Sequence, residues 1–262
     1  KGIIFIYSQY IYAGILPLAF ALEHAGYGKL SRNLLHYPEW KPNSKKHTKN
    51  EPVSYNGKGI SKKGNDSFKQ AKYIILSGNK DLSPNNIDEI KTLMSSENSE
   101  GEQIKIVLGT RVASEGLDFK NIREIHILDP WFHLSRIEQI IGRGIRYCSH
   151  NQLPDKKEHN VTVYLHTASV SEVNESVDIR AYRMAEEKSY QIGKIETILK
   201  SNAVDYYLNK SMNYIQEGDI PSVSLTTSLG TSIQDFKVHD KPFSKICSFQ
   251  DKCDYQNPLD TS

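Results

Sequence analysis

Gln139-Ile140-Ile141-Gly142-Arg143-Gly144-Ile145-Arg146 is the most informative stretch of this 262-residue sequence. On a helix that turns about 100° per residue, four polar side chains fall within one arc of about 80°. They are Arg136, Gln139, Arg143 and Arg146. The aliphatic side chains fall on the opposite side, at Leu134, Ile137, Ile141 and Ile145. The pattern therefore predicts a helix that packs through its aliphatic side chains and presents planar guanidinium groups, which suit phosphate oxygens.

The solvated face of an ordinary surface helix would give a similar pattern, but the composition of the chain argues against that alternative. The sequence contains 25 Lys and only 8 Arg, yet three of those arginines lie between positions 136 and 146. Lys and Glu serve equally well on a surface that only meets water, whereas Arg provides a fixed fork of donors. We therefore interpret these arginines as ligands of a phosphate group. Trp131 and Phe132, just before the helix, could stack on a base, but their position favours a packing role.

The net charge of +2 is too small to identify a partner, but the charge is unevenly distributed. Between Lys41 and Lys72, nine lysines stand against Glu51 and Asp66, which gives a local charge of +7. Such a run could act as a clamp that adds salt-dependent affinity for nucleic acid. The alternative, a solvated insertion in a Lys-rich chain, is slightly favoured.

The cysteines indicate a reducing, intracellular compartment rather than a disulfide framework; they are Cys148, Cys247 and Cys253. A metal site built on Cys247, Cys253 and His239 would match no common zinc spacing, so we predict no metal centre. The apolar run Ile11–Leu22 is too short to cross a bilayer. Since the chain begins with Lys1 directly on a strand-like run, we expect it to be part of a longer protein.

Short apolar runs alternate with helical patterns, which predicts an α/β fold built on a parallel sheet. Several of the runs are almost entirely apolar, as expected for strands that are covered on both faces. The strand candidates are Gly2–Tyr7, Tyr73–Ser77, Ile104–Leu108, Glu124–Leu128 and Val161–His166. We assign residues 1–170 to this domain, with a Lys-rich insertion at residues 38–70.

Residues 171–262 form a predicted C-terminal extension that is mainly helical. Ile179–Lys200 has helical periodicity in its apolar residues, and Ala203–Leu208 is a second, shorter helix candidate. The residues that follow are rich in Ser, Thr and Asn with scattered aromatic residues. We therefore expect the extension to be helical to about residue 210 and irregular after that.

A second informative stretch, Ile104–Phe119, runs from a buried strand into a polar turn. In open parallel sheets, ligands bind where strands end at the carboxyl edge. Thr110 is placed to offer its hydroxyl to a backbone phosphate, and Gly116 would allow positive φ and a close approach. Asp118 would accept a hydrogen bond from a ribose hydroxyl or orient the arginines. The alternative, an ordinary strand-to-helix connection, is made weaker by the arginine helix that follows.

These segments resemble conserved motifs of superfamily 2 helicases and translocases. Gly109–Phe119 resembles motif V, Gln139–Arg146 resembles motif VI with its pattern Q-x-x-G-R-x-x-R, and Ile3–Ser8 is similar to motif IV. The resemblance covers residues 1–170. It implies the second RecA-like lobe of these motors, a parallel sheet with helices on both faces.

Longer matches resemble helicases of nucleocytoplasmic large DNA viruses, a group that includes the poxvirus early transcription factor small subunit, a DNA-dependent ATPase. The segments that carry this resemblance are Ser114–Phe119, His126–Trp131, Arg136–His150, Arg183–Lys188 and Gln191–Lys194. It implies the C-terminal half of an ATP-dependent helicase or translocase that acts in viral transcription, in the host cytoplasm or in the virion.

In the implied motor, ATP and Mg²⁺ lie between two lobes. The first lobe supplies the P-loop and the acidic residues that hold Mg²⁺, and the second lobe supplies arginines. Arg146 would be the arginine finger, Arg143 would contact the γ-phosphate, and Gln139 would couple the nucleotide state to lobe closure. Gly116 and Asp118 would complete the ATP-binding side of this lobe.

The implied nucleic-acid contacts come from Ser8, Thr110 and Arg111. These residues would touch the sugar-phosphate backbone, which lets a motor track a strand without identifying its sequence. DNA is favoured over RNA as the substrate. Further implied partners are the N-terminal RecA-like lobe of the same protein and a viral RNA polymerase, and no membrane partner is expected.

The sequence also departs from that of a complete motor. It contains no G-x-x-x-x-G-K-[ST]. Asp88-Glu89 only superficially resembles an acidic D-E box, because it follows the helix start Ser83-Pro84 and favours the helix dipole there. We therefore expect half of an ATPase site, inactive by itself. The alternatives are a non-catalytic factor that keeps this lobe to bind nucleic acid or a polymerase, and an unrelated nucleotide-binding α/β domain.

Overall fold

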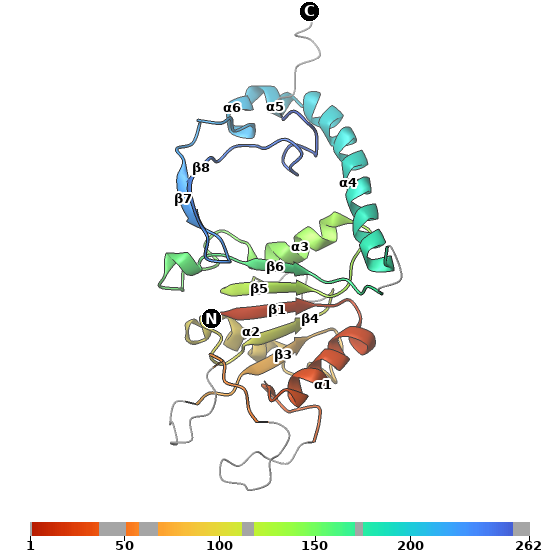
Figure 1. Ribbon diagram of the computed structural model, residues 1–262, viewed down its shortest axis with the longest axis vertical. Helices are drawn as coiled ribbons and strands as arrows, with labels where there is room; N and C mark the ends of the chain where they lie inside the picture. Colours follow the sequence, from red (N-terminus) through yellow and green to blue (C-terminus); the bar gives the residue numbers. More distant parts are fainter. Residues whose placement is uncertain (1, 37–50, 58–67, 112–117, 171–174, 254–262) are drawn as a thin grey trace, which may run out of the picture. The chain divides into compact units, whose positions relative to one another are not determined.

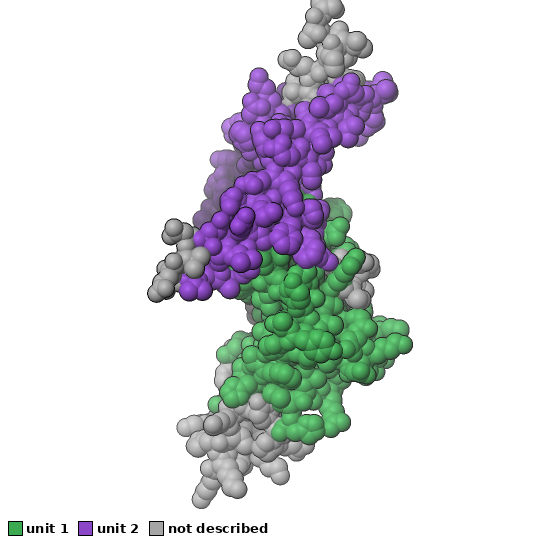
Figure 2. Space-filling model, turned by 90° about the vertical axis from the view of Figure 1, so that its right-hand side faces the viewer, with its two compact units in different colours: residues 1–130, 137–167 green, residues 131–136, 168–262 purple. Residues whose placement is uncertain are grey.

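The structure is a computed structural model that describes residues 2–36, 51–57, 68–111, 118–170 and 175–253. The chain divides into two compact units (Figure 2). The first unit consists of residues 1–130 and 137–167, and the second consists of residues 131–136 and 168–262. The second unit therefore contains almost all of the predicted C-terminal extension.

A six-stranded parallel sheet forms the framework of the first unit, in the spatial order β2-β3-β4-β1-β5-β6 (Figure 1). The strands are β1 Ile3–Tyr7, β2 Gly28–Lys29, β3 Lys72–Leu76, β4 Ile106–Gly109, β5 Ile122–Ile127 and β6 Thr162–Leu165. Every strand that the sequence predicts is present, and the sheet with its helices confirms the RecA-like α/β fold. Within this sheet, β2 is the strand that the sequence does not predict, because its two residues carry no periodic pattern.

Helices pack on both faces of this sheet. On one face, Ile15 and Ala19 from the π-helical turn Ile11–Ile15 and from α1 (Leu16–His24) belong to one core cluster with residues of three strands. Those strand residues are Ile6 of β1, Tyr73 and Ile75 of β3, and Ile106 and Leu108 of β4. On the opposite face, α3 (Leu134–Gly144) packs against β5. A shorter helix, α2 (Asn86–Met94), contributes the buried side chain of Leu93.

The Lys-rich run Lys41–Lys72 lies mostly outside the described residues. Where it is described, Ser54 forms an isolated antiparallel bridge with Gln70, and Lys69 pairs with Glu102. Neither contact distinguishes a nucleic-acid clamp from a solvated insertion, so the role of the run stays a prediction.

The arginine helix α3 ends earlier than the sequence predicts. It buries Ile137, Ile140 and Gly144. Ile145, predicted on the packed side, is 56% exposed. A Cβ atom on Gly144 would lie 2.8 Å from Ile125 Cδ1 and 3.1 Å from Ile122 Cγ2, so the helix backbone lies directly on β5. This contact sets the packed side of the helix, and Arg146 follows the end of the helix instead of lying on it.

The second unit has its long helix near its start, and short regular elements interrupt the stretch after residue 210 that the sequence predicts to be irregular. Its helices are α4 Val177–Ser201, α5 Val204–Leu208 and α6 Lys210–Asn213. An antiparallel hairpin follows, made of β7 (Val223–Thr226) and β8 (Ser232–Phe236). The hairpin is missed because most of its side chains are exposed, and alternating apolar residues appear clearly only in strands with one buried face. None of the helices in the described part of the chain is long and apolar enough to span a bilayer.

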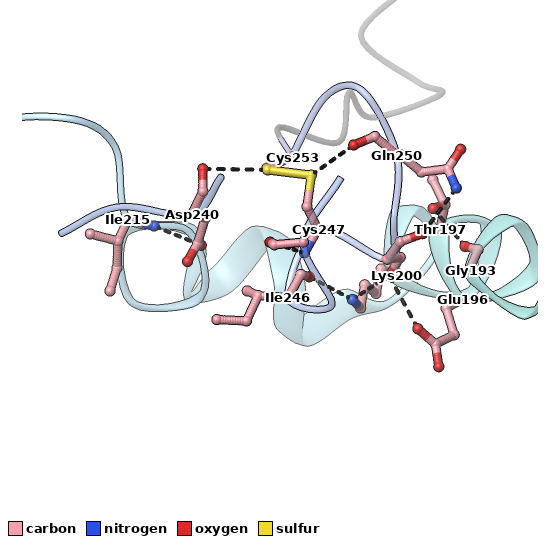
Figure 3. The surroundings of a disulfide bond; sticks show 12 residues. Gly193, Glu196, Thr197, Lys200, Ile215, Asp240, Ile246, Cys247, Gln250 and Cys253 are labelled. Atoms are coloured by element: carbon pink, nitrogen blue, oxygen red, sulfur yellow. Dashed lines mark hydrogen bonds between the residues drawn. A yellow bond between two sulfur atoms is a disulfide. The ribbon is translucent and has the colours of Figure 1, made fainter. Parts of the chain in front are cut away.

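A disulfide joins Cys247 to Cys253 and closes a loop that lies on α4 (Figure 3). The loop comes so near that a Cβ atom on Gly193 would lie 2.0 Å from the carbonyl oxygen of Ser248. Lys200 Nζ donates to the carbonyl oxygen of Ile246 at 3.1 Å and to Ser248 Oγ at 2.6 Å. The prediction of free thiols therefore holds only for Cys148. The pairing escapes sequence reasoning because it depends on a chain reversal that brings the two Cα atoms to 4.7 Å.

Gly144→Ala is expected to lower the free energy of unfolding by about 1–3 kcal/mol, because the added methyl group overpacks the contact with β5. Gly142→Ala, on the same helix, is the matched control. A Cβ atom at that position meets nothing within 4 Å, and Ala is the better helix former. Urea unfolding of both variants measures the difference, and equal stability would contradict the close approach at Gly144.

Candidate functional site

The predicted site residues lie at opposite edges of the sheet. Ser8 and Thr110 directly follow β1 and β4, at the carboxyl edge. Arg146 lies toward the amino edge, because Gly144 contacts Ile122, the first residue of β5. Since β5 has six residues and a strand of that length extends about 20 Å, the strand separates the two sets.

The guanidinium group of Arg146 is held from two sides. Nη1 donates to Asp118 Oδ1 at 2.7 Å, and Nε donates to the carbonyl oxygen of Gly142 at 3.0 Å. The side chain keeps 37% of its surface exposed, so the group is oriented and still accessible. Of the two roles considered for Asp118, the structure shows the contact with an arginine, and the ribose contact stays a prediction.

Hydrogen bonds brace the turn that follows α3. Asn121 N donates to the carbonyl oxygen of Ser149 at 2.9 Å, and Ser149 N donates to that of Arg146 at 3.1 Å. The Ser149 hydroxyl lies 3.2 Å from the carbonyl oxygen of Gly144. Two residues here have left-handed backbone angles, Cys148 with φ 60° and Asn121 with φ 58°. The bracing thus maintains conformations that non-glycine residues rarely adopt.

His150 is buried behind this turn, with 8% exposure. Its Nε2 lies 2.7 Å from the carbonyl oxygen of Ile122, and its Nδ1 lies 2.9 Å from Ser149 Oγ. A carbonyl oxygen only accepts, so Nε2 carries a proton. Burial lowers the pKa of His150, and the positive charges of Arg123 and His159 act in the same direction, while the hydrogen bond to Ile122 opposes them. Nothing in the sequence indicates that Ser149 and His150 are buried and bonded to each other rather than exposed on the surface.

Acidification is expected to weaken the brace. The unfolded chain binds a proton at His150 near the ordinary pKa of about 6.5, whereas the folded protein binds it only at lower pH. The stability given by the neutral ring is therefore complete above pH 6.5 and is lost as the pH falls toward the folded-state pKa.

The free energy of unfolding, measured in urea at about pH 7.5 and at about pH 5.5, tests this expectation, because the stability given by the neutral His150 ring declines between these two values. His150→Gln should show a smaller decline than the wild type. His133→Gln, at an exposed histidine, should decline like the wild type. A decline in His150→Gln as large as in the wild type would contradict the protonation state assigned to His150.

The other polar residues of the predicted arc have different surroundings. Arg136 lies over the ring of Trp131, 4.2 Å from its centroid, and Trp131 packs against Phe132. Gln139 is exposed and Arg143 is partly buried. Arg136 therefore packs on an aromatic ring, unlike Arg143 and Arg146, the arginines predicted to contact phosphate.

At the carboxyl edge, both predicted hydroxyl residues are buried. Ser8 Oγ donates to Asp129 Oδ2 at 2.6 Å, and Gln9 N donates to the same oxygen at 2.7 Å. Thr110 is 5% exposed, and its hydroxyl lies 3.4 Å from the carbonyl oxygen of Leu76. In this structure the two hydroxyl groups fix the ends of β1 and β4, and their contact with a nucleic-acid backbone stays a prediction.

Three further residues bear on the predicted site. Arg111, predicted to contact nucleic acid, is exposed. Gly116 lies outside the described residues, so its predicted close approach to ATP stays a prediction. Asp129 is the residue that the sequence analysis missed, although an acidic residue directly after β5 in the Asp-Pro pair was a usable signal.

A comparison with known families decides the class of the domain. Residues 57–148 match the family model of the helicase conserved C-terminal domain. This chain carries a helicase C-terminal domain. The predicted residues inside the matched range are Thr110, Arg111, Gly116, Asp118, Gln139, Arg143 and Arg146. Ser8, which is buried, precedes that range.

The helicase domain has relatives in large DNA viruses. The chain is 30% identical, over 267 aligned positions, to the putative ATP-dependent RNA helicase L377 of Acanthamoeba polyphaga mimivirus. This match covers 98% of this chain and 22% of the mimivirus protein. The chain is also 30% identical over 230 residues to the termination factor NPH-I homolog of African swine fever virus, covering 79% of this chain and 31% of that protein.

A third relative is the nucleoside triphosphatase I of Heliothis armigera entomopoxvirus, which is 33% identical over 117 residues. That match covers 45% of this chain and 18% of the entomopoxvirus protein. This chain thus spans less than a third of the length of each of these relatives. The comparisons confirm the resemblance to viral helicases that the motifs indicate.

Proposed function

We propose that this chain is the C-terminal lobe of an ATP-dependent nucleic-acid helicase or translocase and that it supplies the arginine finger. The observation that carries the proposal is the orientation of Arg146, which Asp118 and the carbonyl oxygen of Gly142 hold while its side chain stays accessible. A charged donor held in this way stabilises developing negative charge without having to reorganise. The match to a helicase domain supports the same function.

The proposed chemistry is phosphoryl transfer from ATP to water, in which negative charge spreads over the γ-phosphate oxygens. Arg146 would donate to one of these oxygens while Asp118 keeps the guanidinium plane in place. Arg143 would add a second positive charge from α3, and Gln139 would couple the nucleotide state to lobe closure. These groups fit the phosphate end of a nucleotide because Arg presents several donors in a fixed plane.

Mg²⁺, when bound with ATP, neutralises charge on the phosphates. Among the residues that the structure describes, no group of three or more His, Cys, Asp or Glu side chains is placed to hold a metal ion. We assign Mg²⁺ and the P-loop to the N-terminal lobe of the same protein.

The names of the relatives bear on the biological process. One is named an RNA helicase, one a termination factor homolog and one a nucleoside triphosphatase. On this basis we propose that the protein acts in the transcription of a large DNA virus, in the host cytoplasm or the virion. The proposed track is a nucleic-acid strand, with DNA favoured over RNA, and the proposed protein partner is the viral RNA polymerase.

Arg146→Ala in the complete protein is expected to lower nucleic-acid-stimulated ATP turnover by about 10³-fold or more, because the transition state loses its arginine. Nucleic-acid binding should persist. Arg32→Ala, at an exposed arginine beside His36, is the matched control and should keep full turnover. A phosphate-release assay with single-stranded DNA measures all three proteins. Unchanged turnover in Arg146→Ala would favour the alternative function, a non-catalytic binding factor.

Asp118→Asn is expected to lower kcat by up to about 10²-fold, because the guanidinium group loses its fixed orientation. KM for ATP should change little, since Arg146 remains present. The free energy of unfolding should change by less than about 1 kcal/mol, because the ion pair is exposed. Steady-state kinetics together with urea unfolding separate these effects. A raised KM with unchanged kcat would instead assign Asp118 to binding of the ground state.

A further inference from the structure

The second unit buries few apolar side chains for its size. Among its described residues, the buried apolar side chains are those of Ala181, Ala185, Tyr206, Cys247 and Cys253. Two of these five form one disulfide. Protein units that bury little apolar surface depend on other ties, such as disulfides, metal ions or partners. The bond between Cys247 and Cys253 is therefore a main tie within this unit.

The disulfide connects three segments of the second unit (Figure 3). The loop that it closes lies on α4, where Lys200 Nζ donates to Ser248 Oγ at 2.6 Å. At the other end of the loop, Cys253 Sγ lies 3.5 Å from the carbonyl oxygen of Asp240. Asp240 N donates to the carbonyl oxygen of Ile215 at 2.9 Å, and Ile215 N donates to Asp240 Oδ2 at 3.1 Å. The bond thus joins the last described residues both to α4 and to the segment before the hairpin.

Without its sulfur bond, the loop has little apolar anchoring. Phe243 is 67% exposed and Ile246 is 65% exposed. Three residues have left-handed backbone angles: Phe243 with φ 59°, Ser248 with φ 51° and Phe249 with φ 58°. Residues other than glycine keep such angles only where the surrounding structure maintains them. We therefore expect the loop to open readily once the disulfide is broken, because few buried contacts remain to hold it.

The surroundings of the pair also suit the reduced thiols. Cys247 Sγ lies 3.5 Å from the carbonyl oxygen of Gln250, and Cys253 Sγ lies at the same distance from that of Asp240. A thiol is a weak donor, so each S–H group has an acceptor nearby after reduction. The two cysteines are six positions apart in the sequence, so the thiols stay close enough to pair again. The bond can therefore be broken and reformed without leaving a buried donor unsatisfied.

We infer that Cys247 and Cys253 form a reversible redox site, which fastens residues 240–253 to α4 when it is oxidised and releases them when it is reduced. The reductant is a dithiol. One of its thiolates attacks Cys253, the more exposed of the two cysteines, and Cys247 leaves as a thiolate that takes up a proton. The second thiolate of the reductant then displaces Cys253, which also becomes a thiol. The protein gains two electrons and two protons, and the reductant leaves as its own disulfide.

The experiment uses the complete protein in buffers with different ratios of reduced to oxidised dithiothreitol. Backbone hydrogen exchange and thiol alkylation are measured on the same samples by peptide mass spectrometry. Reduction should speed exchange about tenfold or more at the amides of Phe243 and Phe249, which donate to the carbonyl oxygens of Gln250 and Ser244 in the closed loop. Alkylation and exchange should change at the same buffer ratio. The amide of Ile4, which is bonded within the sheet of the first unit, should keep its rate.

Two variants separate the pair from the third cysteine. Cys253→Ala should exchange quickly in the loop whether or not the reductant is present. Cys148→Ala, which removes the exposed free thiol, should respond to the reductant like the wild type. The wild-type titration needs no variant, so it decides the question even where Cys253→Ala does not fold.

Three results would overturn the redox site. Unchanged loop exchange in protein whose two thiols are both alkylated would show that the bond does not control the loop. A disulfide that resists every buffer ratio in the folded protein would be a permanent structural bond. Faster exchange at Ile4 as well would show general unfolding instead of a local release. The ATP turnover of Arg146→Ala is independent of all three results, because the redox site does not depend on the proposed function.

Discussion

At Gly144 the backbone of α3 lies against Ile122 and Ile125, with no room for a Cβ atom. The position of Arg146 depends on this contact. Because Ile122 is the first residue of β5, the contact fixes the end of the helix near the amino edge of the sheet. It also ends the run of helical side chains just before Arg146, which leaves that arginine on a turn. A longer side chain at this position would move the helix away from the strand, and the arginine would move with it.

The polar groups of the turn are what make this position stable. A buried polar group without a partner costs about 1–3 kcal/mol, and the turn buries Ser149 and His150 directly behind the exposed arginine. Both side chains find partners, the hydroxyl at Gly144 and the imidazole at Ile122. The same bonds that satisfy these groups also orient the turn. Stability and orientation therefore have one physical origin here, and they respond together when His150 gains a proton.

The sequence predicts the strands, the arginine helix and the family, because each rests on a local pattern. Long apolar runs identify buried strands, and the Q-x-x-G-R-x-x-R motif is specific in itself. The sequence says less where contacts between distant residues decide the result. Ser8 follows a strand, and only the fold shows that its hydroxyl is buried and donates to Asp129, far away in the sequence. The disulfide of Cys247 likewise depends on a chain reversal that no local pattern reveals.

The separation of the two edges bears on how a motor of this kind would couple ATP to its track. The chain leaves the carboxyl edge after β5 at Asp129, which holds Ser8 and the backbone of Gln9. It returns through α3, whose 11 residues extend about 16 Å, to Arg146 near the amino edge. Helix and strand are locked to each other at Gly144, so a displacement of the arginine by a closing lobe moves both as one body. In the proposed motor, a rigid shift of α3 and β5 would therefore carry the nucleotide state to the carboxyl edge, and no separate relay of side chains is required.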